Sequence, residues 1–252
     1  MRFCCGLCVL LSAILEIAGQ EPAAPAAATP EPTRQQVKVL ETNVASSVRL
    51  PYLLYLPADY AKNDAKWPVL IYLHGGSLRG GDIDRLRNLG LPRRLEIEPN
   101  FPFIVVSPHC AEGEIWTGVG ALGALLDQVV RDYRVDADRI YITGHSMGGR
   151  GALYFAYRMP DRFAAVAAVS AISPILSWGS KLAHTPLWII HGTADMTAPI
   201  AEIGDLVKAI EKAGGHPRFD TLEGRDHSIL DIYNQPEIFD WLKQQKRAGP
   251  KQ

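Results

Sequence analysis

Hydrophobic positions divide the chain into two kinds of segment. Residues 37–44 and 48–55 alternate apolar and polar side chains, which predicts a pair of antiparallel strands. Further along, short continuous apolar runs predict strands that are buried on both faces. These runs cover residues 69–73, 103–106, 140–142, 164–169, 187–190 and 219–222.

Helical patterns lie between these runs. Residues 120–133 carry apolar side chains at a helical spacing, and residues 148–158, 201–213 and 236–245 also favour helices. Strands that alternate with amphipathic helices predict an α/β fold with a mostly parallel central sheet and helices on both faces. With 252 residues, 47% of them hydrophobic, the chain can bury the core of such a domain.

Reactive or small residues follow the predicted strands. His74 and Gly75 follow the run at 69–73, His109 and Cys110 follow 103–106, and Asp195 comes shortly after 187–190. Because parallel strands end at the same edge of a sheet, we expect these residues to line one cleft.

Ser146 is the candidate nucleophile. It lies between Gly144 and Gly148, directly after a predicted strand and before a helix rich in small residues. A serine at such a sharp turn has a strained backbone and an exposed hydroxyl group. Two glycines and a serine at this spacing also occur by chance, so the interpretation depends on the strand, the helix and suitable partners.

A serine nucleophile needs a base and an acid that orients the base. Among seven histidines, we choose His227, which follows the last predicted strand, and we choose Asp195 as the acid. Asp226 is the main alternative acid, although its place next to His227 makes a hydrogen bond to the ring awkward. We expect His145 to support the turn at Ser146.

Two backbone N–H groups are expected to stabilise the oxyanion. Met147 would provide one, and Gly76 or Ser77 would provide the other. Candidate substrate contacts are Trp116, Trp178 and His74, because side chains on loops beside the cleft can offer contact area. Core packing is an equal alternative for the two tryptophans, and His74 could shape its loop.

The N-terminal region has the layout of a secretory signal. Residues 1–19 contain an apolar run after Arg2, residues 20–36 are rich in alanine and proline, and residues 37–247 form the predicted catalytic domain. This pattern predicts a secreted or periplasmic protein with no stable membrane span after cleavage, and an uncleaved anchor is the alternative. Removal of the signal would leave Cys110 as the single cysteine, which we interpret as a buried structural thiol.

Charge gives no sign of a nucleic-acid partner. The formal net charge is −1, with 26 basic and 27 acidic residues. We interpret local basic groups, such as Arg85 with Arg87 and Arg93 with Arg94, as solvated faces.

Together these residues resemble the α/β-hydrolase superfamily, in particular phospholipase/carboxylesterase-like enzymes related to dienelactone hydrolases and prolyl oligopeptidase domains. The resemblance rests on residues 72–76, 144–149, 191–195 with Pro199, and 226–227. It implies a serine hydrolase that needs no metal or cofactor, with a triad of Ser146, Asp195 and His227. Residues 170–186 leave no room for a large cap, so the cleft should be open, and the absence of a preceding β-propeller argues against oligopeptidase activity.

The favoured function is hydrolysis of a small-molecule carboxylic ester through an acyl-enzyme. Activity should fall as the pH drops through roughly 6 to 7, where an ordinary histidine takes up a proton. Amide or peptide hydrolysis would use the same residues, and a non-catalytic binding protein could reuse the fold. The sequence leaves the acyl group, the alcohol and the oligomeric state open.

Overall fold

The structure, a computed structural model, describes residues 35–44, 46–98 and 100–247. The predicted signal at 1–19 and most of the linker at 20–36 lie outside the described residues. The first strand, β1 (Gln35–Val44), begins two residues inside the predicted linker and pairs antiparallel with β2 (Ser46–Tyr55), as the alternating pattern predicted.

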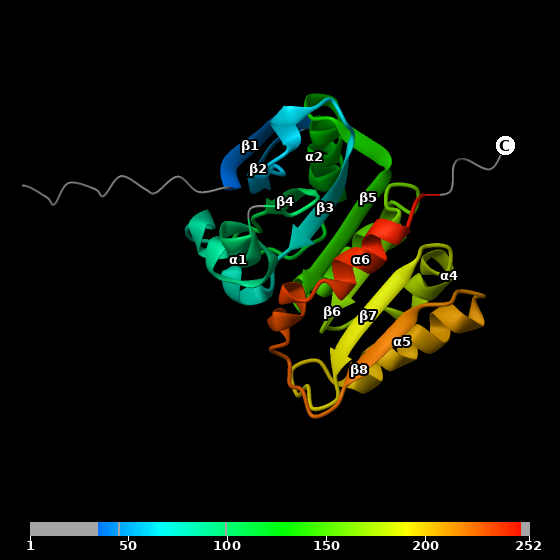
Figure 1. Cartoon of the computed structure of the whole chain (residues 1–252). Helices are drawn as coiled ribbons and strands as arrows, with labels where there is room; N and C mark the ends of the chain where they lie inside the picture. Colours follow the sequence, from blue (N-terminus) through cyan, green and yellow to red (C-terminus); the bar gives the residue numbers. More distant parts are fainter. Residues whose placement is uncertain (1–34, 45, 99, 248–252) are drawn as a thin grey trace, which may run out of the picture. The chain divides into compact units, whose positions relative to one another are not determined.

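The described residues form an eight-stranded sheet in the order β1-β2-β4-β3-β5-β6-β7-β8 (Figure 1). All neighbours from β4 to β8 are parallel, and β2 joins them antiparallel to β4. The parallel strands are β3 (Trp67–Leu73), β4 (Ile104–Pro108), β5 (Val135–His145), β6 (Ala165–Val169), β7 (Leu187–Gly192) and β8 (Arg218–Leu222). The mostly parallel α/β sheet predicted from the sequence is confirmed.

Each face of the sheet has its own hydrophobic core. Alternate residues of β3 show this division, because Val69 and Ile71 belong to one cluster and Leu70 and Tyr72 to the other. The first cluster is covered by α2 (Val119–Asp132), α3 (Met147–Arg158), α4 (Gly179–Leu182) and α5 (Ile200–Lys212). The second is covered by α1 (Gly90–Ile97) and α6 (Glu237–Gln244), and α6 lies in front of the sheet in Figure 1.

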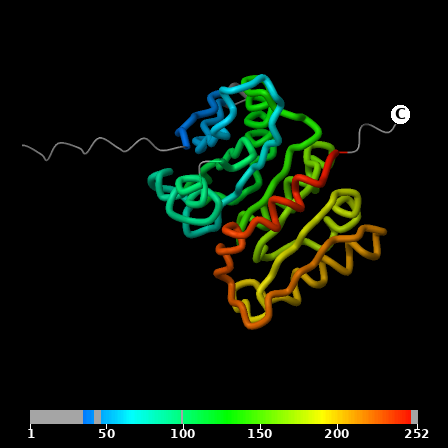
Figure 2. The backbone as a smooth tube through the Cα atoms, viewed as in Figure 1, coloured from blue at the N-terminus to red at the C-terminus, as the bar shows by residue number. Residues whose placement is uncertain are grey.

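Short 3₁₀ helices connect these elements. They are η1 (Tyr60–Lys62), η2 (Gly76–Leu78), η3 (Ile83–Asn88), η4 (Leu176–Trp178) and η5 (Leu230–Asn234). Two of them, η2 and η4, follow β3 and β6 at the carboxyl edge of the sheet. The chain reaches this edge at the end of each strand from β3 to β8. Figure 2 traces this course in colours from cyan to orange.

Two features of this region differ from the sequence prediction. Helix α1 was not predicted, and the side chain of Arg94 is not solvated. The side chain of Arg94 is only 15% exposed, donates to Glu98 and to the carbonyl of Tyr233, and lies over the ring of Phe239. Arg94 therefore packs against the C-terminal part of the chain, and its interpretation as a solvated residue was wrong.

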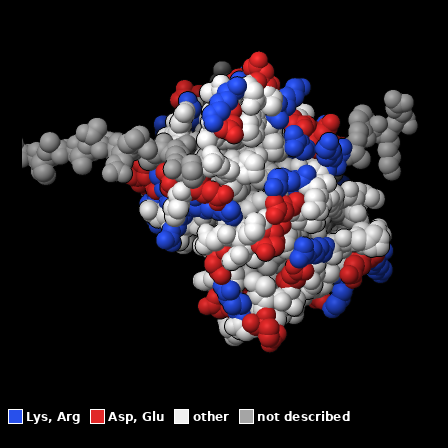
Figure 3. All heavy atoms as spheres, viewed as in Figure 1, with Lys and Arg blue, Asp and Glu red and all other residues white. Residues whose placement is uncertain are grey.

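The surface in Figure 3 carries basic and acidic side chains interspersed, without a continuous basic tract on the face shown. Within the described ranges, no helix has both the length and the apolar character needed to cross a membrane.

Candidate active site

Ser146 occupies the sharp turn between β5 and α3. Its φ of 59° and ψ of −119° lie in a region that non-glycine residues rarely adopt. Its N–H donates to the carbonyl of Val169 on the neighbouring β6, at 2.9 Å. A methyl group at Gly148 would overlap the carbonyl oxygen of Leu73, so the helix can approach β3 only without a side chain there. The strained turn predicted from the sequence is present.

The structure brings Ser146, His227 and Asp195 together from three different loops. The Oγ of Ser146 lies 2.8 Å from Nε2 of His227, and Nδ1 of the same ring lies 2.7 Å from Oδ2 of Asp195. Both distances are within hydrogen-bond range. With the proton on Nδ1 donated to the carboxylate, Nε2 is free to accept the proton of the serine hydroxyl.

The Asp195 carboxylate is fully shielded from solvent. Its Oδ1 accepts hydrogen bonds from the N–H groups of Thr197 and Ala198, at 2.9 and 2.8 Å, and Oδ2 faces His227. Burial raises the pKa of Asp195, but the hydrogen bonds from Ala198 and His227 outweigh burial and bring it below the ordinary value. The acid therefore stays ionised beside the histidine. The alternative acid, Asp226, caps its own turn by accepting from the N–H of Ser228.

His191 also approaches the acid. It is fully buried, its Nε2 lies 2.7 Å from the carbonyl of Ala198, and the same atom is 3.3 Å from Oδ2 of Asp195. With its proton on Nε2, His191 donates a hydrogen bond to the carbonyl of Ala198 and so holds the turn that carries Asp195. A signal for this contact was present in the sequence, because His191 precedes Asp195 by four residues at the end of a strand.

The predicted oxyanion donors lie on two backbone segments near Ser146. Met147 is the first residue of α3, where N–H groups have no partner inside the helix. Gly76 begins η2, and the preceding Gly75 approaches Ser146 so closely that a methyl group on Gly75 would lie 3.6 Å from the serine Cβ. The assignment of Met147, Gly76 and Ser77 as oxyanion donors stays a prediction.

Two arginines hold this loop, and one of them, Arg85, was interpreted from the sequence as part of a solvated basic face. Arg79 donates from Nε to the carbonyl of Gly76 at 3.3 Å, and Arg85 donates to the carbonyl of Ser77 at 3.0 Å. Their contacts orient these carbonyl groups toward the arginines. Arg85 follows Ser77 by eight residues, so no short spacing in the sequence could indicate the contact.

His74 does not reach the substrate side of the site, which corrects the predicted contact. The residue is fully buried, its Nδ1 donates to the carbonyl of Gly75 at 2.8 Å, and its Nε2 accepts from the N–H of Cys110 at 3.0 Å. Burial lowers the pKa of His74 to about 4, so the ring is neutral at ordinary pH. Its role is to hold the loops after β3 and β4, the alternative considered from the sequence.

The two candidate tryptophans are also buried, in line with the core-packing alternative. Trp116 is 5% exposed and donates from its indole N–H to the carbonyl of His74, at 2.9 Å. Trp178 is 4% exposed and stacks on Tyr157, with Arg150 over its ring. Trp116 also lines a cavity, so its contact with substrate stays a prediction.

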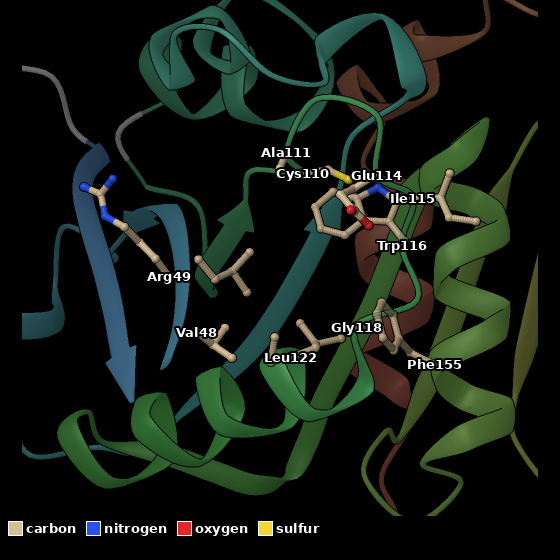
Figure 4. A pocket seen from close by; sticks show the side chains of 12 residues that line it. Val48, Arg49, Cys110, Ala111, Glu114, Ile115, Trp116, Gly118, Leu122 and Phe155 are labelled. Atoms are coloured by element: carbon tan, nitrogen blue, oxygen red, sulfur yellow. The ribbon is translucent and has the colours of Figure 1, made fainter. Parts of the chain in front are cut away.

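A cavity of about 280 Å³ lies beside Trp116, under the segment that follows β4 (Figure 4). Its walls come from β2, from the segment after β4, from the region around the start of α2, and from α3. The lining residues are Val48, Arg49, Leu50, Cys110, Ala111, Glu114, Ile115, Trp116, Gly118, Ala121, Leu122 and Phe155.

Burial raises the pKa of the Cys110 thiol to about 11, which agrees with its interpretation as a structural residue.

Across the residues that the structure describes, no three His, Cys, Asp or Glu side chains form a group that could hold a metal ion. The arrangement of hydroxyl, imidazole and carboxylate in the site is suited to nucleophilic attack on an electrophilic carbon.

Comparison with known proteins places this site in context. A family model described as "Putative esterase" matches residues 122–211. The bifunctional acetylxylan esterase/xylanase XynS20E of Neocallimastix patriciarum is 28% identical over 149 residues, which are 56% of this chain and 21% of that protein. Acyl-protein thioesterase 1 homolog 2 of Dictyostelium discoideum is 29% identical over 189 residues, which are 63% of this chain and 84% of that protein.

A solved structure, that of a thermostable esterase, is similar to this chain. The two superpose with a TM-score of 0.73 at 26% identity, over 85% of this chain and 64% of the other. The chain thus spans about a fifth of the bifunctional enzyme and under two thirds of the thermostable esterase.

Proposed function

We propose, from the premise that the chain belongs to the α/β-hydrolase superfamily and is carboxylesterase-like, that it hydrolyses carboxylic esters with Ser146 as nucleophile. The observation that carries the proposal is the continuous contact from Ser146 through His227 to Asp195. The similar proteins are named as esterases or as a thioesterase, which favours esters over amides.

The reaction would proceed in two acyl transfers. His227 accepts the hydroxyl proton on Nε2 while Oγ of Ser146 attacks the ester carbonyl carbon. The tetrahedral intermediate collapses, the bond to the alcohol oxygen breaks, and His227 returns the proton to that oxygen. Water, deprotonated by the same ring, then attacks the acyl carbon. The bond from that carbon to Oγ of Ser146 breaks, His227 returns the proton to Oγ, and the carboxylic acid is released. Asp195 stabilises the imidazolium formed in both steps.

The negative charge on the carbonyl oxygen needs two donors. We assign these to the N–H of Met147, at the start of α3, and to the N–H of Gly76 or Ser77. The start of a helix is suited to this role because its N–H groups and its dipole both favour negative charge. Loss of one such donor typically costs about 3 kcal/mol of transition-state stabilisation.

Exposed apolar side chains support an ester with an apolar group. They lie on three loops at the edge of the sheet that carries Ser146: Ile115 after β4, Ile175 and Leu176 after β6, and Met196 next to Asp195. Apolar surface beside a polar site is typical of substrate-binding regions. A butyrate ester is therefore a better first substrate than an acetate.

Hydrolysis of p-nitrophenyl butyrate tests the proposal. Ser146→Ala should lower kcat by about three to six orders of magnitude, because the nucleophile is lost. Ser180→Ala, an exposed serine on α4, is the matched control and should retain full activity. Equal activity in the Ser146 variant and the wild type, at equal thermal stability, would contradict the proposal.

We also propose that the protein is exported. The support is the apolar segment within residues 1–19 and the alanine- and proline-rich residues 20–36. N-terminal sequencing of the mature protein should find a start near residue 20. Recovery of the exported protein with Met1 in place would contradict cleavage and favour an anchor.

A further inference from the structure

His145 lies next to both the proposed nucleophile, Ser146, and the proposed base, His227, but is not a member of the triad. It is the last residue of β5, directly before Ser146, and its side chain is buried. Its Nε2 lies 2.7 Å from the backbone carbonyl oxygen of His227, and the two imidazole rings are 5.0 Å apart. Because a carbonyl can only accept, Nε2 of His145 must carry the proton and donate it.

The other side of the His145 ring faces the loop after β3. A methyl group on Gly75 would lie 3.5 Å from Nδ1 of His145, so the ring lies close to that backbone. One side chain thus lies beside the loop of the predicted oxyanion donors and is hydrogen-bonded to the loop of His227. Burial lowers the pKa of His145 to about 4, so the ring stays neutral while it makes these contacts.

The loop that carries His227 is attached to the segment after β7 through residues that precede the histidine. The carbonyl of Arg225 accepts from the N–H of Ala194 at 3.0 Å, and the N–H of Gly224 donates to Oγ1 of Thr193 at 2.8 Å. Residues 223–226 and Ser228 are exposed, and the ion pair of Arg225 with Asp231 lies at the surface. The carbonyl of His227 accepts from the N–H of Ile229 at 3.1 Å and from His145. Exposed ion pairs contribute little to order, and the contacts of Gly224 and Arg225 lie before the histidine. The hydrogen bond from His145 acts on the backbone of His227 itself.

We infer that His145 is a positioning residue, which holds the backbone of His227 so that Nε2 of the base stays within hydrogen-bond distance of Ser146. It does not touch the reacting atoms, and it acts through the carbonyl of His227. A misplaced base costs rate because proton transfer requires a short, aligned contact. The inference rests on the proposed function, since it concerns the same base.

Two substitutions separate the hydrogen bond from the packing. His145→Phe keeps an aromatic ring but removes the donor, whereas His145→Gln keeps an N–H donor without the ring. In His145→Phe, kcat per active site titrated with a fluorophosphonate should fall about 10- to 100-fold, with KM changed less than threefold. His145→Gln should recover most of the loss.

A second readout does not depend on turnover. Hydrogen–deuterium exchange of residues 223–229 should become faster in His145→Phe and remain near the wild-type rate in His145→Gln. Unchanged exchange in both variants would overturn the inference, whether or not the protein hydrolyses esters. Equal kcat per titrated site in His145→Phe and wild type would also overturn it, whereas a wild type without esterase activity would instead contradict the proposed function.

Discussion

Two histidines at strand ends, on opposite sides of β5 in the sheet, have opposite surroundings. His74 follows β3 and is fully buried, with one ring nitrogen bonded to the carbonyl of Gly75 and the other to the N–H of Cys110. His227 follows β8, and its side chain is 18% exposed, with its nitrogens facing Asp195 and Ser146. Backbone partners make the first ring structural, whereas side-chain partners make the second ring suited to proton transfer.

This contrast shows that the position of a histidine at a strand end does not decide its role. Both rings lie in loops at the same edge of the sheet, and both have two hydrogen-bonded nitrogens. The difference is that a hydroxyl group can give up its proton to His227, whereas the backbone N–H that faces His74 cannot. The chemistry therefore depends on the partner groups.

The same substitution at the two positions should give the largest separation of effects. His227→Gln should lower kcat for p-nitrophenyl butyrate at least about a thousandfold, because an amide cannot accept the serine proton. His74→Gln should lower the free energy of unfolding by about 1–3 kcal/mol through lost packing and weakened hydrogen bonds. Its kcat per folded molecule should stay within about tenfold of wild type.

Enzyme kinetics and urea unfolding of both variants measure this contrast. The folded fraction at the assay temperature is the control, since a destabilised His74 variant could lose activity by unfolding. A loss of kcat in folded His74→Gln as large as that in His227→Gln would show that His74 takes part in the reaction.

Stability should depend on pH through the buried rings. The pKa values of His74 and His145 are lowered to about 4 by burial, from 6.5 in an exposed histidine. The unfolded chain therefore binds protons between these two values that the folded chain does not. Stability from these neutral rings is complete above pH 6.5 and is lost as the pH falls toward 4, by up to about 3 kcal/mol for each histidine.

Urea unfolding at pH 7 and pH 4.5 measures this loss. His145→Gln should show a smaller loss between the two pH values than the wild type, because one titrating ring is gone. The Asp195 carboxylate loses its stabilising contacts only at lower pH, since its pKa is below the ordinary value. Equal free energies of unfolding at pH 7 and pH 4.5 would mean that the two rings are not buried in their neutral form.

The sequence was sufficient for the features that depend on local pattern. Apolar runs predicted the parallel strands, and the residues after them predicted that Ser146, Asp195 and His227 would meet, because parallel strands end at one edge. The contact of these three side chains at 2.7 and 2.8 Å agrees with that expectation. Their roles in a reaction stay a proposal.

Features that depend on distant contacts could not be predicted. Trp116 lies in a long loop after a predicted strand, but its indole N–H donates a hydrogen bond to the carbonyl of His74, 42 residues earlier, inside the protein. Arg94 belongs to a short helix with a proline, and its partner Tyr233 is 139 residues away. Local periodicity contains no information about such pairs.

The mass of the protein after treatment with a fluorophosphonate tests the central claim most directly. Folded wild type should gain a single adduct, located at Ser146 by peptide mass spectrometry, because His227 activates that hydroxyl. The Ser146→Ala variant should gain none under the same conditions. An adduct at another residue, or no adduct in folded wild type, would contradict the assignment of Ser146 as the nucleophile.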